Sequence, residues 1–245
     1  MTVIASAQSP EVFGGLHLAL LGLTVLLGVV VVWGVRHVRG THTEISITTI
    51  AGWVLLVSTL IRMVWFLLPE NWHIDHSLPL HYSDALRVIA AIALIRRSRW
   101  SIAITYYWGL TLNPQALVTP HPNMLVGPSV EFVLYWWLHI LVQLAPLALI
   151  WGSGYRPQWR DFSIAYGVAL TWAALAMTVN ALIGTNYAFL NQLPDGRSLM
   201  DFLGPWPIYV LWVAVLVALV WALMTWPWTP RSAKAKRDTD HTPAV

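Results

Sequence analysis

Apolar residues form seven long stretches separated by short polar gaps, and this alternation dominates the chain. The stretches cover residues 12–35, 45–68, 77–95, 101–119, 129–151, 161–184 and 205–228. Each is near the roughly 20 residues that a helix needs to cross about 30 Å of hydrocarbon. The pattern therefore predicts an all-α polytopic membrane bundle of seven transmembrane helices. We expect residues 1–228 to form a single domain.

The basic residues gather on one side of this predicted bundle. The gaps after the first, third and fifth stretches, together with the tail, hold 11 of the 14 Lys and Arg residues: Arg36, Arg39, Arg96, Arg97, Arg99, Arg156, Arg160, Arg231, Lys234, Lys236 and Arg237. Arg197 is the one basic residue in the opposite gaps. By the positive-inside rule, the N-terminus is expected outside and the C-terminus in the cytoplasm, as in a multi-pass protein of the cell membrane. Residues 229–245 lack apolar periodicity and are expected to be a disordered basic cytoplasmic tail.

The composition supports a membrane protein and narrows its chemistry. The chain is 57% hydrophobic and 10% charged, whereas soluble domains carry about 25% charged residues. The sequence pI of 9.4 follows from the arginines of the cytoplasmic side, so no nucleic-acid partner is predicted. The chain has no cysteine, which excludes disulfides, a Cys nucleophile and a Cys-ligated metal.

Polar side chains inside the stretches gather near the predicted outer surface. Such groups are costly within a membrane, so they usually face the bundle interior or a wet cavity and are candidates for function. At a rise of 1.5 Å per residue, seven of them lie within roughly 5 to 10 Å of the outer boundary, and His139 lies at roughly 15 Å. The seven are His17, Arg62, Ser83, Asp84, Asn113, Gln115 and Asn180. We expect them to surround one pocket that opens outward.

The densest polar segment runs from His81 to Arg87. On a helix, Asp84 shares a face with both of these residues, and Ser83 shares a face with Arg87. An ion pair of Asp84 with Arg87 or Arg62 would neutralise the charges and fix helix packing, and a serine within a span more often joins two helices than acts as a nucleophile.

A nucleophilic Ser83 would need a base from another stretch. Either His139 or His17 could serve, and the estimated depth of His17 matches Ser83 better. The outer gaps also hold His73, His76 and His121 near Glu70 and Asp75, but their irregular spacing lacks the i, i+4 pair of a helical zinc site, so no metal site is predicted.

Several longer motifs resemble the bacterial YwaF-like integral membrane proteins, which are similar to the eukaryotic transmembrane-protein-164 family. The resemblance extends from about residue 13 to 226 and rests on LPLHYSD (78–84), WGLTLNPQALVTP (108–120), His139, NALIGTNYAFL (180–190) and SLMDFLGPWP (198–207). The eukaryotic relatives are regarded as acyltransferases that act on phospholipids through an intramembrane Cys and a His. In this sequence the family Cys falls on Ser83 and the family His on His139. Because Ser is a weaker nucleophile than Cys, Ser83 either performs the same acyl transfer with an adjacent base or is not catalytic.

The resemblance and the polar set together indicate a lipid-modifying acyltransferase. Ser83 would attack an ester, His139 would accept its proton, and Asp84 would complete the catalytic group. Asn113 or Gln115 would stabilise the oxyanion. The other residues expected to line the binding site are His17, Arg62, His81, Arg87 and Asn180.

A membrane lipid or acyl chain is the expected binding partner, with no soluble cofactor and no assigned protein partner. The alternative is a non-catalytic lipid or solute carrier, or a subunit of an envelope-assembly complex. In that case Asp84, Arg62 and Arg87 would form a structural or gating charge network.

Overall fold

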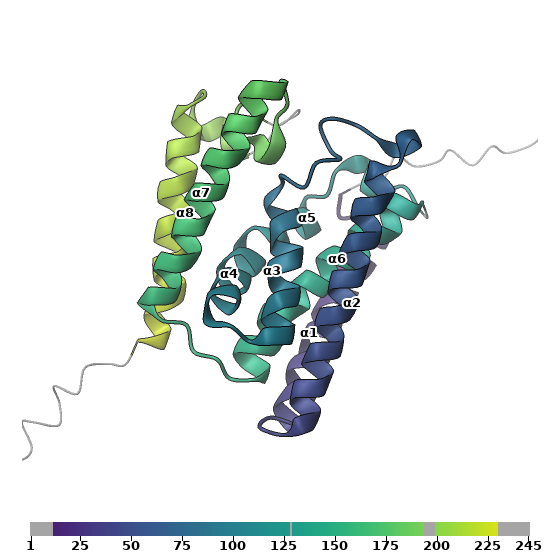
Figure 1. The fold of residues 1–245 in the computed structure, drawn as a ribbon, viewed down its shortest axis with the longest axis vertical. Coiled ribbons are helices and arrows are strands. Elements are labelled where there is room, and N and C mark those ends of the chain that lie inside the picture. The colour runs from purple at the N-terminus through teal and green to yellow at the C-terminus, as the bar shows by residue number, and fades with distance from the viewer. Residues whose placement is uncertain (1–11, 128, 194–198, 230–245) are drawn as a thin grey trace, which may run out of the picture.

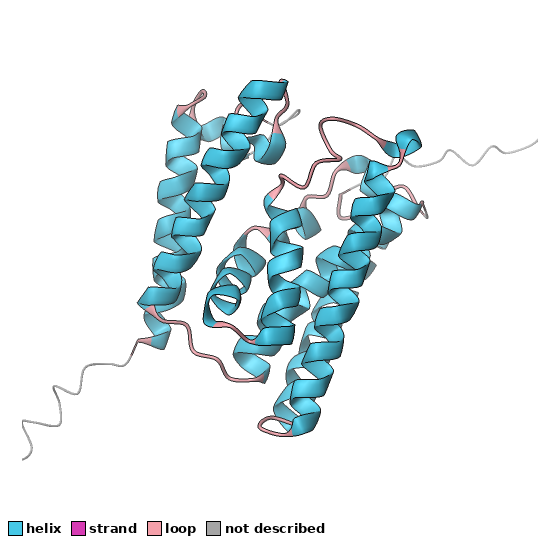
Figure 2. Ribbon diagram, viewed as in Figure 1, coloured by secondary structure: helices cyan, strands magenta, loops and turns pink. Residues whose placement is uncertain are grey.

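The computed structural model describes residues 12–127, 129–193 and 199–229, and these residues form helices and loops without a β-strand (Figure 2). The α-helices are α1 (Gly15–His37), α2 (His42–Leu67), α3 (Tyr82–Arg96), α4 (Arg99–Thr111), α5 (Asn113–Val118), α6 (Val130–Leu147), α7 (Trp159–Ile183) and α8 (Ile208–Thr225). A π-helical turn, η3 (Ala148–Gly152), extends α6. Short 3₁₀ turns are η1 (Pro69–Asn71), η2 (Pro122–Leu125), η4 (Tyr187–Phe189), η5 (Leu199–Leu203) and η6 (Trp226–Trp228).

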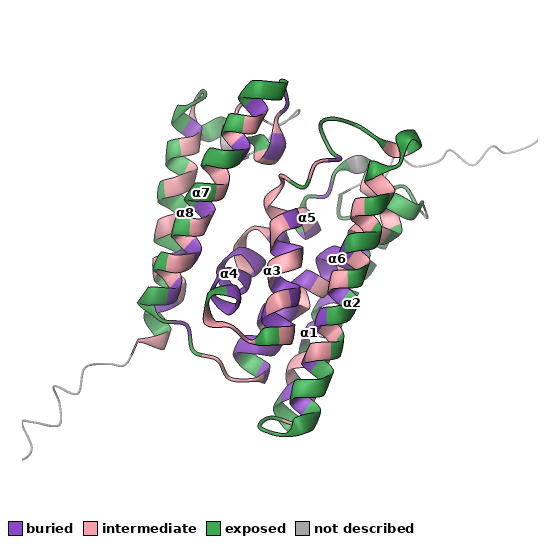
Figure 3. Ribbon diagram, viewed as in Figure 1, coloured by how far each residue is buried: buried purple, intermediate pink, exposed green. Residues whose placement is uncertain are grey.

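The helices are arranged around α3, α4 and α6. The ribbon shows α1 and α2 on one side, α7 and α8 on the other, and α3 to α6 between them (Figure 1). Buried residues concentrate on the central helices (Figure 3). The apolar window of α6 with η3 is 56% buried, against 17% for α1, α2, α7 and α8. The central helices therefore form the protein core, and the outer helices present most of their surface outward.

The outward surface is apolar. Large hydrophobic side chains are exposed along the outer helices, among them Val25, Trp33, Val64, Leu211 and Leu223. Five helices are long and apolar enough to cross a membrane: α1, α2, α6 with η3, α7, and α8 with η6. Lipid tails are the natural surroundings of such surfaces. The expectation of an all-α membrane protein is thus confirmed.

The third and fourth predicted stretches differ from the expectation. α3 begins at Tyr82 rather than at 77 and has 15 residues, and α4 has 13 residues before α5 begins at Asn113. At 1.5 Å per residue these helices are about 22 and 20 Å long, shorter than the hydrocarbon layer. The physical cause is proline: Pro79 precedes α3, and Pro114 cannot donate the hydrogen bond that would continue α4.

The loops alternate between the two ends of the bundle. The connections after α1, α3 and η3 lie at the lower end of the ribbon together with the end of α8, and the connections after α2, α5 and α7 lie at the upper end (Figure 1). The basic gaps of the sequence therefore share one end. Residue 229 is the one described residue of the predicted tail, so the expected disorder of the tail lies outside the described residues.

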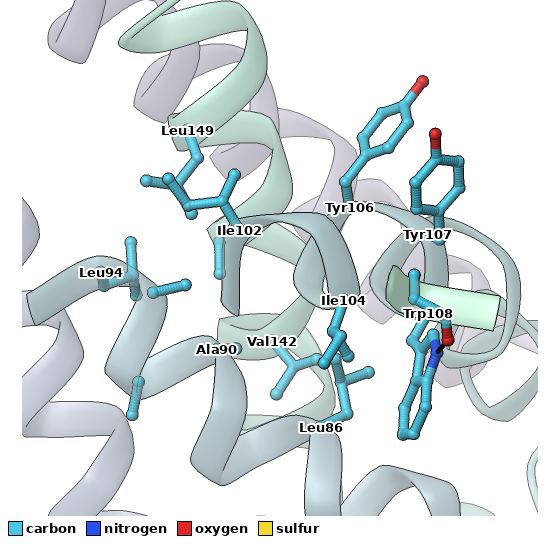
Figure 4. Packing of buried hydrophobic residues seen from close by; sticks show 14 of the residues in the cluster. Leu86, Ala90, Leu94, Ile102, Ile104, Tyr106, Tyr107, Trp108, Val142 and Leu149 are labelled. Carbon is cyan, nitrogen blue, oxygen red and sulfur yellow. Dashed lines mark hydrogen bonds between the residues drawn. The ribbon is translucent and has the colours of Figure 1, made fainter. Parts of the chain in front are cut away.

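The core joins α3 to three neighbouring helices. Leu86, Ala90 and Leu94 of α3 pack with residues of α4 and α6, including Ile104 and Val142 (Figure 4). On the other side, α2 approaches α3 closely at Gly52, where an added Cβ would lie 2.9 Å from the carbonyl oxygen of Ala91. Small residues permit such close helix contacts in membranes. This packing places the polar start of α3 between α2 and α6.

Candidate functional site

Asp84 forms ion pairs with both nearby arginines. Its Oδ1 accepts hydrogen bonds from Arg62 Nη1 of α2 at 3.0 Å and from Arg87 Nη1 at 2.6 Å. Its Oδ2 accepts a hydrogen bond from the backbone N–H of His81 at 3.2 Å. A carboxylate in the first turn is also favoured by the helix dipole. The ion pair expected between Asp84 and Arg62 or Arg87 is therefore present with both partners.

The two arginines differ in their surroundings. Arg87 is buried, and its Nε has no hydrogen-bond partner. The Arg62 side chain remains 18% exposed, and its guanidinium carbon lies 4.6 Å from the centre of the Phe66 ring. One arginine is thus enclosed between the helices, and the other reaches toward the edge of the bundle.

His139 of α6 faces this cluster. Its Nδ1 lies 2.7 Å from the carbonyl oxygen of Tyr135, so Nδ1 carries the hydrogen and donates. Its Nε2 is then the acceptor and lies 3.5 Å from Nη2 of Arg87. This hydrogen bonding assigns a neutral imidazole whose lone pair points at the guanidinium.

Ser83 is half-buried at the start of α3, and its hydroxyl makes no hydrogen bond to another described residue. Ser83 and His139 therefore form no direct hydrogen bond, and Nε2 of the imidazole faces Arg87 instead. The expected transfer of the Ser83 proton to His139, directly or through one water, stays a prediction. Helical spacing still places Ser83 on the same face as Arg87, one turn nearer the upper end. The unbonded hydroxyl and the arginine that contacts His139 thus share one face of α3.

Asn113 supports His139 from the start of α5. Its Nδ2 donates to the carbonyl oxygen of His139 at 3.0 Å and to Oε1 of Gln143 at 2.9 Å. Both donors are thus used within the protein, whereas Oδ1 is buried without a partner. Gln143 was missed in the sequence, although it follows His139 by one helical turn. Gln115 is exposed and donates only to the carbonyl oxygen of Thr111, at 3.3 Å, so it does not join the cluster.

His17 lies apart from the Asp84 cluster and contacts other residues. Its Nδ1 accepts from the backbone N–H of Phe13 at 2.9 Å, and its Nε2 lies 2.8 Å from the carbonyl oxygen of Leu117. The ring packs against Trp136. Both nitrogens are occupied and neither meets Ser83, so His17 joins α1 to α5 in this arrangement.

Asn180 and His81 hold the loop that follows α7. The Asn180 Oδ1 accepts from Tyr187 N at 2.8 Å and from Thr185 Oγ1 at 3.0 Å, while its Nδ2 donates to the Tyr187 carbonyl oxygen at 3.0 Å. His81, which precedes α3, accepts from the backbone N–H of Ala188 at 3.3 Å and lies edge-on to the Tyr187 ring. These two residues anchor the loop beside the start of α3 and make no direct contact with His139.

Acidic and histidine side chains do not assemble into a metal-binding group of three or more anywhere in the described part of the chain. His73, His76 and His121 therefore remain separate loop residues.

An apolar helical bundle that encloses an arginine-rich polar cluster defines a class: α-helical integral membrane proteins with polar chemistry between their helices. Residues 12–225 match the sequence model of the TMEM164 family. This match spans most of the chain, so the chain belongs to the TMEM164 family, and the resemblance carried by its motifs is confirmed. No curated protein and no solved structure matches the chain.

Proposed function

We propose that this protein crosses the cell membrane seven times, with an outer N-terminus and a cytoplasmic C-terminus. The arginine-rich loops lie at the end of the bundle where α8 ends (Figure 1), and the positive-inside rule assigns that end to the cytoplasm. The short helices α3 and α4, with α5, would complete the crossings in the centre of the bundle. Irregular backbone is tolerated at membrane depth where protein encloses it.

Cysteine labelling tests this orientation against a clean background, because the chain has no cysteine of its own. His73→Cys or His121→Cys should react with an impermeant maleimide in intact cells. Ser98→Cys and Lys234→Cys should react only after the membrane is opened. Labelling with the two sides exchanged would reverse the orientation.

We further propose that the protein is a lipid-modifying acyltransferase with Ser83 as nucleophile and His139 as proton acceptor. One observation supports this proposal: the unbonded hydroxyl of Ser83 lies on the face of α3 that carries Arg87, and Arg87 contacts Nε2 of His139. A nucleophilic serine requires such a base. The family resemblance assigns the same two positions to the nucleophile and the histidine.

The reaction would proceed in two steps. Ser83 Oγ attacks the ester carbonyl carbon of a membrane lipid and passes its proton to Nε2 of His139, directly or through one water. Collapse of the tetrahedral intermediate breaks the ester bond, and the leaving alkoxide takes the proton from His139. The hydroxyl of a second lipid then attacks the acyl-serine, with His139 again accepting and returning the proton.

A fluorophosphonate probe tests the nucleophile directly. The purified wild-type protein should be covalently labelled and should transfer or release fatty acid from lipid, whereas Ser83→Ala should do neither. Labelling of Ser83→Ala equal to that of the wild type would remove Ser83 from the mechanism.

The contact between Arg87 and His139 favours a second candidate function. Here the protein is a non-catalytic lipid or solute carrier, or a membrane subunit of an envelope-assembly complex, and the charge network fixes or gates the helices. This function would be distinguished from acyl transfer if the wild type bound lipid but showed neither turnover nor fluorophosphonate labelling.

A further inference from the structure

The cluster around Asp84 carries more positive than negative charge. Arg62 and Arg87 share the single carboxylate of Asp84, and no other acidic side chain among the described residues pairs with either guanidinium. His139 is neutral in its observed hydrogen bonding. One positive charge therefore remains uncompensated between helices of a membrane protein, where such a charge is expensive.

The free donors of this cluster suit an oxyanion. Arg87 Nε is buried without a partner, although the rest of that guanidinium is engaged. Arg62 is partly exposed, and the apolar ring of Phe66 lies beside its guanidinium. Guanidinium groups bind phosphate through charge-assisted and often bidentate hydrogen bonds. An anion that entered past Arg62 would satisfy both the excess charge and the orphaned donor.

We propose that Arg62 and Arg87 bind the phosphate group of a membrane phospholipid, and that this occupancy lets His139 accept the proton of Ser83. The second half of this inference rests on the acyl-transfer function proposed above. A proton on Nε2 of His139 would face the Arg87 guanidinium at 3.5 Å, and such like charges repel strongly in a medium of low dielectric constant. A phosphate that neutralises Arg87 removes this repulsion. The phosphate of the bound lipid thereby prepares the base that acts on its own ester.

The source of the phosphate is a lipid because the cluster lies within an apolar bundle. α2, which carries Arg62, exposes apolar side chains close to it in the sequence, at Ile61 and Val64. Acyl chains beside these residues would leave a lipid phosphate within reach of Arg62, whereas inorganic phosphate would lose its hydration without such compensation.

Arg62→Gln is the informative variant. It removes the excess charge but keeps the pair of Asp84 with Arg87, so the variant retains a neutralised cluster and should fold. Binding is measured by calorimetry on the full-length protein in dodecyl maltoside, a detergent without phosphate. The probes are dihexanoylphosphatidylcholine, the matched dihexanoylglycerol and inorganic phosphate.

We expect the phosphatidylcholine to bind the wild type about tenfold or more tightly than Arg62→Gln, which corresponds to loss of one hydrogen bond to a charged group. The diacylglycerol should bind both proteins equally, and Arg62→Lys should restore part of the difference. Arg99→Gln, which removes an arginine from the other end of the bundle, is the matched control and should bind like the wild type. Equal phosphatidylcholine affinity in wild type and Arg62→Gln would overturn the site. Inorganic phosphate binding as tightly as the lipid would overturn the lipid assignment.

An activity measurement separates this inference from the proposed function. Acyl transfer by the wild type should be about tenfold or more faster from the phosphatidylcholine than from the diacylglycerol, and Arg62→Gln should lose that preference. Equal transfer from both donors would overturn the role of phosphate and leave the acyltransferase standing. Selective phosphate binding without any transfer would overturn the acyltransferase and the coupling to His139, while the phosphate site would stand.

Discussion

Two buried carboxylates, Asp84 and Asp161, lie at opposite ends of the molecule. Asp84 pairs with two arginines and Asp161 with one. Asp161 meets a single arginine: its Oδ1 accepts from Arg99 Nε at 2.6 Å, and its Oδ2 accepts from Tyr155 Oη at 3.1 Å and from Gln158 N at 2.9 Å. The other arm of Arg99 donates to Gln158 Oε1 at 2.6 Å. Burial raises the pKa of the Tyr155 hydroxyl, so it stays protonated and continues to donate.

The difference distinguishes a structural ion pair from a site prepared for a ligand. At Asp161 the charges balance and every carboxylate oxygen is used, which fastens the loop before α7 to α4. At Asp84 the charges do not balance, Arg87 Nε lacks a partner, and the neighbouring Ser83 is free. Unsatisfied buried groups are rare in folded proteins and point to missing partners or to function.

The largest expected effect is on turnover at the Asp84 end. Ser83→Ala should lower acyl transfer by a factor on the order of 10³ or more, as for other nucleophiles that act with a base. Its stability should stay near that of the wild type, because Ser83 makes no hydrogen bond. His139→Ala should abolish transfer as well, and Ser83→Cys should retain it because a thiol is the better nucleophile. Undiminished transfer by Ser83→Ala, measured with a labelled lipid, would end this assignment.

Removing either carboxylate should be the next largest effect, this time on stability. Asp84→Ala leaves two arginines without their acidic partner, and Asp161→Ala leaves one. Loss of one partner from a buried pair typically costs about 3 to 5 kcal/mol. The free energy of unfolding in mixed micelles with dodecyl sulfate measures both.

The double variant Asp84→Leu with Arg87→Leu sharpens the comparison. It should be less destabilised than Asp84→Ala, since it removes a charge together with its partner. A double variant as unstable as the single one would mean that packing, and not charge, dominates at Asp84.

Sequence reasoning predicted the chemistry of the Asp84 cluster better than its geometry. That Asp84 must find a basic partner follows from the cost of a charge in a span, and the structure supplies Arg62 and Arg87. Depth along a helix, however, does not fix the direction in which a side chain points. His17 matches Ser83 in estimated depth yet faces α5, whereas the long side chain of Arg87 reaches across to His139.

The sequence pattern was also a poor guide to where helices are interrupted. The stretch 101–119 is mostly apolar, so its composition predicts one helix, and Pro114 signals the break between α4 and α5. Apolar length identified the five long helices, four of which present most of their surface outward. It could not distinguish a spanning helix from the short buried helices that pack at the centre.

A smaller effect is expected for Arg99→Gln. The Arg99 side chain is 39% exposed, whereas the Asp161 carboxylate is fully buried and keeps its hydrogen bonds from Tyr155 Oη and Gln158 N. Stability should fall by about 1 to 3 kcal/mol, the cost of removing one partner from a buried polar group. Lipid binding and acyl transfer should not change, because this pair lies at the end opposite Asp84. Loss of transfer in Arg99→Gln would mean that the two ends are coupled.

The smallest effect is expected for Gln115→Ala. Gln115 was expected to stabilise an oxyanion, but it is exposed and its side chain donates only to the carbonyl oxygen of Thr111 in the preceding turn. Its removal should change the free energy of unfolding by less than about 0.5 kcal/mol, as for other surface residues, and should leave acyl transfer unchanged. Asn113→Ala provides the contrast, because it breaks two hydrogen bonds to α6 and should cost about 1 to 3 kcal/mol. Reduced transfer in Gln115→Ala would show that the polar cluster extends beyond Asn113 during the reaction.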